Sequence, residues 1–180
     1  MTFEPSGIKD VILIKPKVFK DERGFFAETF RESTFKKNGI VREFVQDNLS
    51  SSKRNTLRGL HYQIINPQAK LVMVTQGEIL DVAVDIRKNS PTFGESVTAR
   101  LSSYNKHMLF IPEGFAHGFL VLSETATFLY KCSDYYNPKG ERGIRWNDPD
   151  MTLPWPDASP VLSEKDKNLP FLKNVQDLPE

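Results

Sequence analysis

Short strand-like runs separated by turn signals dominate this chain, and they constrain its fold more than any other feature. Among these runs the only helical pattern is a short one at 31–39, where Gly39 ends it. Many short strands without alternating helices are typical of an all-β sandwich or barrel, so we predict that fold class. The runs, rich in β-branched and aromatic residues, cover 10–19, 42–50, 55–63, 69–76, 78–87, 95–102, 107–122 and 125–136.

Prolines limit where regular strands can lie near both ends of the chain. Pro16 lies inside the first run and suggests an edge strand, because proline donates no hydrogen bond to a sheet ladder. After Trp146 the sequence is proline-rich and irregular, apart from a brief helix predicted over 162–172 with Ser163 as its cap. A chain of 180 residues suits one well-buried domain, so we predict a single domain over 1–180 with an irregular extension from about 147.

The charge balance and the cysteine count exclude several classes of protein. The 24 basic and 23 acidic side chains nearly cancel, so no overall field favours nucleic acid or an anionic membrane. Cys132 is the only cysteine, which excludes an intrachain disulfide. The amino terminus lacks the profile of a signal peptide, and no apolar run approaches the roughly 20 residues that cross a bilayer. We therefore expect a soluble, cytoplasmic protein.

Alternation along the strands predicts which polar side chains point inward. Within 78–87 the even-numbered apolar residues form one face, which leaves Asp81 half-buried on the other. Tyr130 and His117 alternate in step with aromatic neighbours, so both should face an interior. Taken alone, either residue is also explained as a core residue whose polar atoms are hydrogen-bonded within the protein. If these faces line one barrel, its lumen holds His61, His117, Tyr130 and Asp81, with Lys70 at a strand end.

The segment LRGLHYQ, residues 57–63, places two groups that can carry positive charge on one strand. In a regular strand Arg58 and His61 point to opposite faces. A bulge at Gly59 would bring both toward one cavity, because glycine inside a strand often marks a bulge or a close backbone approach. An edge strand with scattered polar residues explains the same segment equally well, and both interpretations stay open at this point.

A metal site is a natural alternative for a β-barrel that contains histidines. Zinc or iron sites need three or four ligands, and a His-x-His pair on one strand face usually begins the set in barrels. Here Gln63 stands at the second position of that pair, after His61. With one cysteine and two inward histidines, the sequence predicts no metal ligand set.

Eight segments, in order along nearly the whole chain, carry a family resemblance. They are DERGFFAETF, FVQDN, LRGLHYQ, QAKLV, GEILDVAVDIRKNSPTFG, IPEGFAHGF, FLYKCSDYY and LSEKD. Together they resemble the dTDP-4-dehydrorhamnose 3,5-epimerase family. The resemblance implies an all-β, cupin-type double-stranded β-helix (jelly roll) with short flanking helices. It also implies a homodimer without metal or other cofactor, whose substrate is a dTDP-linked 4-keto-6-deoxyglucose and whose product has the rhamnose configuration.

The resemblance implies four catalytic residues, and epimerisation next to a ketone explains why their types are needed. Loss of a proton beside the ketone gives an enolate, so one group removes a proton and another returns one from the opposite face. His61 matches the family's base, and Asp166 matches the carboxylate that orients it. Tyr130 matches the acid, since a phenol of pKa about 10 is protonated at neutral pH. Lys70 matches the cation near the keto oxygen.

The resemblance also implies residues that bind the rest of the substrate. Arg58 matches the arginine that holds the diphosphate, where a guanidinium fork suits paired phosphate oxygens. Phe26 and Tyr136 could then stack on thymine. Three further groups are implied: Arg23, Phe26 and Glu28 reaching the neighbouring subunit's site, Gln46, Asn48 and Tyr136 contacting the nucleotide, and Asp81 and His117 shaping the pocket.

The function predicted from these residues is inversion at carbons 3 and 5 of the 4-keto sugar. This is the reaction of a dTDP-4-dehydrorhamnose 3,5-epimerase in dTDP-L-rhamnose biosynthesis. One alternative is a 3-epimerase or ketoisomerase of a related dTDP-deoxysugar pathway, because the same pocket serves all three. Another is a non-catalytic sugar-binding cupin, against which the joint presence of His61, Asp166, Tyr130 and Lys70 argues.

Overall fold

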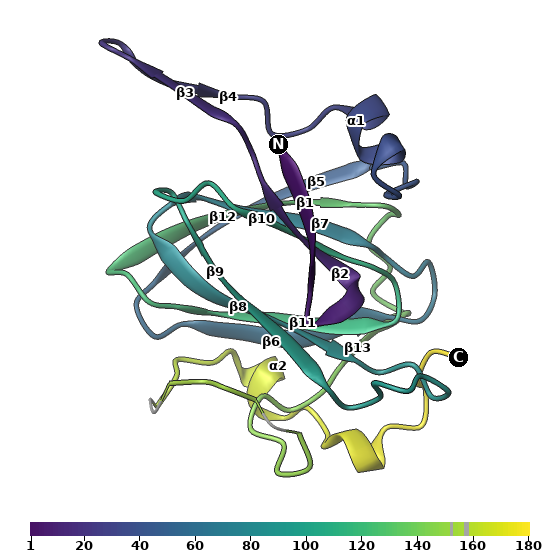
Figure 1. Ribbon diagram of the computed structural model, residues 1–180. Coiled ribbons are helices and arrows are strands. Elements are labelled where there is room, and N and C mark those ends of the chain that lie inside the picture. Colours follow the sequence, from purple (N-terminus) through teal and green to yellow (C-terminus); the bar gives the residue numbers. More distant parts are fainter. Residues whose placement is uncertain (152, 157–158) are drawn as a thin grey trace.

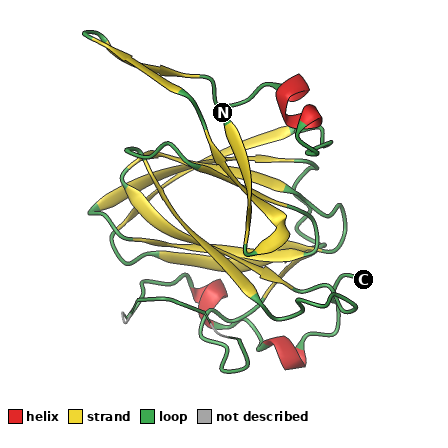
Figure 2. Ribbon diagram, viewed as in Figure 1, coloured by secondary structure: helices red, strands yellow, loops and turns green. Residues whose placement is uncertain are grey.

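Two antiparallel sheets pack face to face in the computed structural model, which describes residues 1–151, 153–156 and 159–180 (Figures 1 and 2). The six-stranded sheet has the order β1 (Thr2–Ser6), β2 (Ile8–Lys15), β10 (Met108–Ile111), β7 (Lys70–Gln76), β12 (Thr125–Cys132), β5 (Gln46–Lys53). The five-stranded sheet has the order β13 (Glu141–Gly143), β6 (Leu57–Gln63), β11 (Phe115–Val121), β8 (Glu78–Asp85), β9 (Ser96–Ser102). The predicted all-β class is confirmed.

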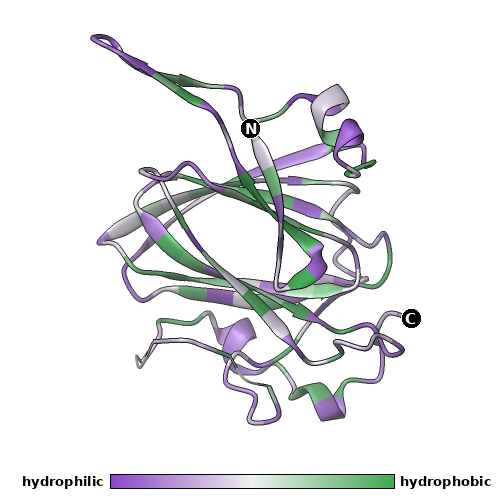
Figure 3. Cartoon of the chain, viewed as in Figure 1, coloured by the Kyte–Doolittle hydropathy of each residue, from purple (hydrophilic) through white to green (hydrophobic). Residues whose placement is uncertain are grey.

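The main core lies between the two sheets and is built from alternate residues of their strands. Val72 and Phe128 from the six-stranded sheet meet Ala83 and Phe119 from the five-stranded sheet, and all four are at most 5% exposed. Figure 3 shows the corresponding hydrophobic stretches along the strands. The strand faces predicted for His117 and Tyr130 are confirmed, because their aromatic neighbours are part of this core.

The outer face of the five-stranded sheet is also buried, under the carboxy-terminal segment (Figure 1). The even-numbered apolar residues of β8 lie on this outer face and pack against Met151 and Leu172. The segment includes α2 (Glu164–Lys167) and the 3₁₀ helix η1 (Leu172–Asn174). Ser163 caps α2 as predicted, but the helix predicted over 162–172 is shorter, because Pro170 disfavours its continuation. Since both faces of β8 are covered, Asp81 is fully buried and the prediction of half-burial is wrong.

A two-stranded hairpin and a short helix flank the six-stranded sheet. The hairpin, called the arm here, consists of β3 (Val18–Asp21) and β4 (Gly24–Ala27) and projects away from the sheets (Figure 1). Helix α1 (Glu32–Lys37) ends just before Gly39, as predicted, and buries Phe35 against the sheet. Neither α1 nor any other helix in the described parts of the chain is long and apolar enough to span a membrane.

Two strand predictions near the amino terminus are wrong. Pro16 does not lie on an edge strand: it follows the last residue of β2, which pairs with β1 on one side and β10 on the other. Proline donates no backbone hydrogen bond, so it ends the ladder there. The run predicted over 42–50 is irregular until Gln46, where pairing with β12 begins.

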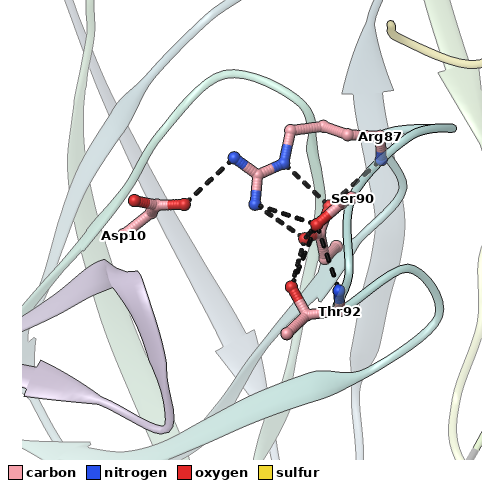
Figure 4. Close-up of polar contacts among 5 residues, drawn as sticks. Asp10, Arg87, Ser90 and Thr92 are labelled. Atoms are coloured by element: carbon pink, nitrogen blue, oxygen red, sulfur yellow. Dashed lines mark hydrogen bonds and ion pairs between the residues drawn. The ribbon is translucent and has the colours of Figure 1, made fainter.

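The connection between β8 and β9 is fixed by one buried carboxylate (Figure 4). Asp85 Oδ2 accepts hydrogen bonds from Ser90 Oγ at 2.5 Å, Thr92 Oγ1 at 2.6 Å and Arg87 Nη2 at 2.7 Å. Arg87 also donates to Asp10 at 3.0 Å, which ties the loop to β2. Burial alone would raise the pKa of Asp85, but these donors outweigh it and lower the pKa to about 2.

Candidate active site

A β-bulge at Gly59 decides where the polar residues of β6 point. His61 pairs with His117 of β11 and Arg58 pairs with Phe119, so two residues of β6 lie opposite one of β11. The bulge predicted at Gly59 is therefore confirmed. The edge-strand alternative is wrong, because β6 lies between β13 and β11.

Glycine is required at this bulge for two reasons. Gly59 has a φ of +116°, in a region that residues with a side chain rarely adopt. An added Cβ would also lie 2.6 Å from the carbonyl oxygen of His117 and 2.7 Å from Cα of Gly118. The backbones of β6 and β11 thus touch where Arg58 and His61 turn toward the same cavity.

That cavity is a cleft of about 370 Å³ with walls from three parts of the fold. The five-stranded sheet contributes Arg58, His61 and His117, and the six-stranded sheet contributes Lys70 and Tyr130. The carboxy-terminal segment supplies the third wall through 161–163 and α2. Charged and phenolic groups from both sheets therefore face one space. The other lining residues are Ser50, Thr56, Leu57, Phe119, Phe128, Val161, Leu162, Ser163, Lys165 and Asp166.

His61 and Asp166 form a close pair within this cleft. Asp166 Oδ1 lies 2.6 Å from His61 Nε2, and the Asp166 residue is only 3% exposed. Burial would raise the pKa of Asp166, but its hydrogen bonds with His61, the Ser163 hydroxyl and the Gly59 backbone lower the pKa instead. An ionised carboxylate only accepts hydrogen bonds, so it favours the tautomer with the proton on Nε2. Nδ1 of His61 is then the nitrogen that can accept a proton.

Tyr130 and Lys70 come from the sheet opposite His61. The Tyr130 ring packs against Phe128, with ring centroids 5.4 Å apart, and burial raises the pKa of its hydroxyl. Burial also lowers the pKa of Lys70, against the attraction of nearby acidic groups. Within the described residues neither the Tyr130 hydroxyl nor Lys70 Nζ has a hydrogen-bond partner. Both groups are available to a molecule in the cleft.

A second histidine–carboxylate pair supports the floor of the cleft. His117 Nε2 lies 2.9 Å from Asp81 Oδ2 and 3.1 Å from Oδ1, and the His117 ring stacks on Phe128. Burial lowers the pKa of His117 and outweighs the opposing effect of Asp81. Asp81 lies behind His117 and does not line the cleft. The prediction that His117 faces the cleft is confirmed, whereas the prediction that Asp81 also lines it is wrong, because Asp81 is buried as the partner of His117.

The predicted nucleotide contacts form a hydrogen-bonded group beside the cleft. Gln46 donates to Asn48 Oδ1 at 3.0 Å and accepts from the backbone nitrogen of Tyr136 at 2.9 Å. Asn48 pairs with Tyr130 across β5 and β12, so the group adjoins the cleft. The Tyr136 hydroxyl donates to Glu141 Oε2 at 2.6 Å. The structure thus brings all three residues together, next to the cleft and outside its lining.

The three predicted site residues in and just after the arm lie outside the cleft of the same chain. Arg23 pairs with Asp21 at the hairpin turn, Glu28 pairs with Arg31, and Phe26 is 67% exposed. None of the three lines the cleft.

Several lining residues were not predicted from the sequence. Lys165 of α2 lines the cleft and forms an ion pair at 2.5 Å with Glu141 of β13, which lies outside the lining. Ser50 lines the cleft and could have been found, as could Ser52 outside the lining, because both alternate in step with Gln46 and Asn48 along β5. Lys165, in the four-residue helix α2, and Val161, just before that helix, gave no such signal, since elements this short carry no periodicity. Among the described residues no group of three or more His, Cys, Asp or Glu could hold a metal ion.

Comparison with known proteins places this arrangement in a family. A family model described as dTDP-4-dehydrorhamnose 3,5-epimerase matches residues 5–174. The chain belongs to this family. A relative named dTDP-4-dehydrorhamnose 3,5-epimerase from Pseudomonas aeruginosa is 56% identical over 163 residues, which cover 89% of this chain and 90% of the relative. A Neisseria gonorrhoeae relative of the same name is 55% identical over 162 residues, which cover 89% of this chain and 49% of that longer protein.

A solved family structure has the same fold over nearly the whole chain. The epimerase from Legionella pneumophila, in complex with dTDP-4-keto-L-rhamnose, superposes with a TM-score of 0.97 at 47% identity. The match covers 99% of this chain and 97% of that one. The predicted cupin-type jelly roll is confirmed by this likeness.

Proposed function

We propose that this protein is a dTDP-4-dehydrorhamnose 3,5-epimerase, an isomerase that converts dTDP-4-dehydro-6-deoxy-D-glucose to dTDP-4-dehydro-L-rhamnose. The observation that carries the proposal is the cleft between the sheets, in which the pair of His61 and Asp166 faces Tyr130 and Lys70. Family membership and relatives of that name at 55% and 56% identity support the choice of reaction.

His61 is the base in this proposal. Its Nδ1 accepts a proton from carbon 3 or carbon 5, on either side of the 4-keto group, and the electron pair moves into an enolate. Asp166, 2.6 Å from Nε2, stabilises the imidazolium that forms. Lys70 stabilises the negative charge on the keto oxygen, and that contribution is largest in a cavity that excludes water.

Tyr130 is the acid, and the opposite sheets provide the required geometry. Inversion needs the new proton to arrive on the face of the sugar away from the base. His61 lies on β6 of one sheet and Tyr130 on β12 of the other, so a sugar between them meets a different group on each face. Because burial raises the pKa of Tyr130, its phenol carries the proton to be donated at neutral pH.

The remaining predicted residues bind the dTDP moiety. Arg58 holds the diphosphate at the cleft, and Gln46, Asn48 and Tyr136 hold the nucleotide beside it. Arg23, Phe26 and Glu28 complete the site of a second subunit in a homodimer, since none of the three lines the cleft of its own chain. Asp81 and His117 shape the floor. The protein acts without metal or other cofactor, in the cytoplasm.

We also infer that residues 1–180 fold as one domain with an extension from about residue 147. The extension supplies Asp166 to the cleft and covers the outer face of β8. A single unfolding transition, seen alike by fluorescence and circular dichroism, would support this inference. Separate transitions for the extension and the sheets would contradict it.

The decisive experiment measures deuterium uptake from heavy water into dTDP-4-keto-6-deoxyglucose, read at carbons 3 and 5 separately. A 3,5-epimerase incorporates deuterium at both carbons and yields the rhamnose configuration. Incorporation and inversion at carbon 3 alone would identify a 3-epimerase instead. Tight binding of the substrate without exchange at either carbon would identify a sugar-binding cupin.

A further inference from the structure

The inward face of β5 is polar along its whole length, which is unusual for a strand of a sandwich. Its inward residues are less exposed than the outward ones between them and include no hydrophobic side chain. The inward residues are Gln46, Asn48, Ser50 and Ser52. Burying a polar group destabilises the folded protein unless the group has a hydrogen-bond partner. Each such group on β5 should therefore have a specific role at the cleft.

Ser52 is the most buried of these residues, and its partner is Arg58. Ser52 is 9% exposed, and its hydroxyl accepts a hydrogen bond from Arg58 Nε at 3.1 Å. The contact crosses from the six-stranded sheet to the five-stranded sheet at the cleft. Arg58 itself is exposed, and in the described parts of the chain it has no carboxylate partner. A guanidinium without a counter-ion at a cleft is suited to an anionic ligand.

The hydrogen bond to Ser52 determines which edge of the guanidinium is free. With Nε engaged, the two terminal nitrogens remain to donate in parallel to paired phosphate oxygens. An arginine with no such anchor would sample many rotamers, and binding would have to order it first. The hydrogen bond to Ser52 restrains Arg58 and leaves both terminal nitrogens free for an anion.

We propose that Ser52 is a positioning residue for the diphosphate of the substrate and acts through Arg58. The inference rests on the proposed function, because it takes a nucleoside diphosphate as the ligand of Arg58. A purely structural role of Ser52 makes a different prediction. Its loss would then lower stability and leave the affinity for the diphosphate unchanged.

The test compares Ser52→Ala, Ser52→Thr and Ser51→Ala with the wild type. Ser51 lies on the same strand with an exposed, outward side chain, so it is the matched control. Calorimetry measures the Kd for dTDP, and steady-state kinetics measure KM and kcat. We expect Ser52→Ala to raise the Kd and KM about 10- to 150-fold, the range for losing one hydrogen bond to a charged group, with kcat within about threefold of wild type. Ser52→Thr keeps a hydroxyl and should restore the Kd, and Ser51→Ala should leave it unchanged.

A double-mutant cycle with Arg58→Ala separates action through Arg58 from any other action. Once Arg58 is absent, Ser52→Ala should not weaken dTDP binding further. If Ser52→Ala raised the Kd for dTDP as much in the Arg58→Ala background as in the wild type, the proposal would be overturned. An unchanged Kd in Ser52→Ala alone would overturn it too. If wild-type protein epimerises its substrate and binds dTDP while Ser52→Ala does so equally, only the role of Ser52 fails. If the wild type neither binds dTDP nor epimerises, the proposed function fails as well.

Discussion

Replacing Gly59 with alanine should destabilise the protein more than the same change at Gly94. Both glycines have positive φ, +116° and +81° respectively. An added Cβ at Gly59 would meet the backbone of His117 and Gly118 at 2.6 and 2.7 Å, whereas one at Gly94 would meet no atom within 4 Å. The two variants share the conformational strain, and only Gly59→Ala adds a clash with a neighbouring strand.

The size of the difference follows from these contacts. A left-handed backbone conformation costs a residue with Cβ about 1–2 kcal/mol, and this cost applies to both variants. Overpacking against a closely packed backbone adds about 1–3 kcal/mol at Gly59 alone. Gly59→Ala should therefore lose about 2–5 kcal/mol of the free energy of unfolding, against about 1–2 kcal/mol for Gly94→Ala. A typical domain has only about 5–15 kcal/mol in total.

Urea unfolding of both variants and the wild type measures this difference, provided that the m-value is unchanged. Turnover by folded protein gives a second readout. The clash would move β6 away from β11 and change the positions of Arg58 and His61, so Gly59→Ala should also lose activity while Gly94→Ala keeps it. Equal losses of stability in the two variants, or full activity in Gly59→Ala, would refute the reasoning from the bulge.

Four other predictions test separate parts of the molecule. His61→Ala should abolish both inversion and deuterium exchange, whereas Tyr130→Phe should slow inversion by about 10² to 10⁴ and retain exchange; normal exchange in His61→Ala would reverse these roles. Because the pKa of Asp85 falls to about 2 from an ordinary 3.8, its stabilisation of about 2 kcal/mol is present above pH 4 and lost as pH falls toward 2. Asp85→Asn should remove the pH dependence of the free energy of unfolding between about pH 4 and 2. The same pH dependence in Asp85→Asn and the wild type would show that Asp85 is not its cause. Sedimentation equilibrium should show an active dimer and no active monomer. Prolonged chelation should leave turnover intact, and rescue of a chelated, inactive enzyme by a divalent metal would disprove metal independence.

Strand alternation predicted much of the inner surface, because a two-residue period survives wherever a strand is regular. It placed His117 and Tyr130 inward correctly, and the glycine in LRGLHYQ correctly indicated the bulge. It misjudged Asp81, because a strand covered on both faces has no solvent side, and the pattern of apolar residues cannot show what packs outside. That cover comes from residues more than 60 positions later in the chain.

The site depends on contacts that no local pattern predicts. Asp166 lies 105 residues after His61, and its place beside the histidine was known only from the family resemblance. Lys165 and Glu141 form their ion pair between a four-residue helix and a three-residue strand. Elements this short have no periodicity of their own, so only the tertiary fold determines their positions. The arm was missed because 10–19 was predicted as one strand that includes Pro16, whereas β2 ends at Lys15 and the first strand of the arm begins at Val18.

The carboxy-terminal segment covers β8 and at the same time holds the partner of His61. Enzymatic activity therefore requires that this segment is packed on the five-stranded sheet, as well as that the two sheets are folded. A local opening that releases the segment would leave the sandwich assembled, separate the base from its carboxylate, and expose the apolar outer face formed by Val82, Val84 and Ile86. Thermal inactivation should then precede the loss of sheet structure, and the inactive species should be prone to aggregate through that newly exposed face.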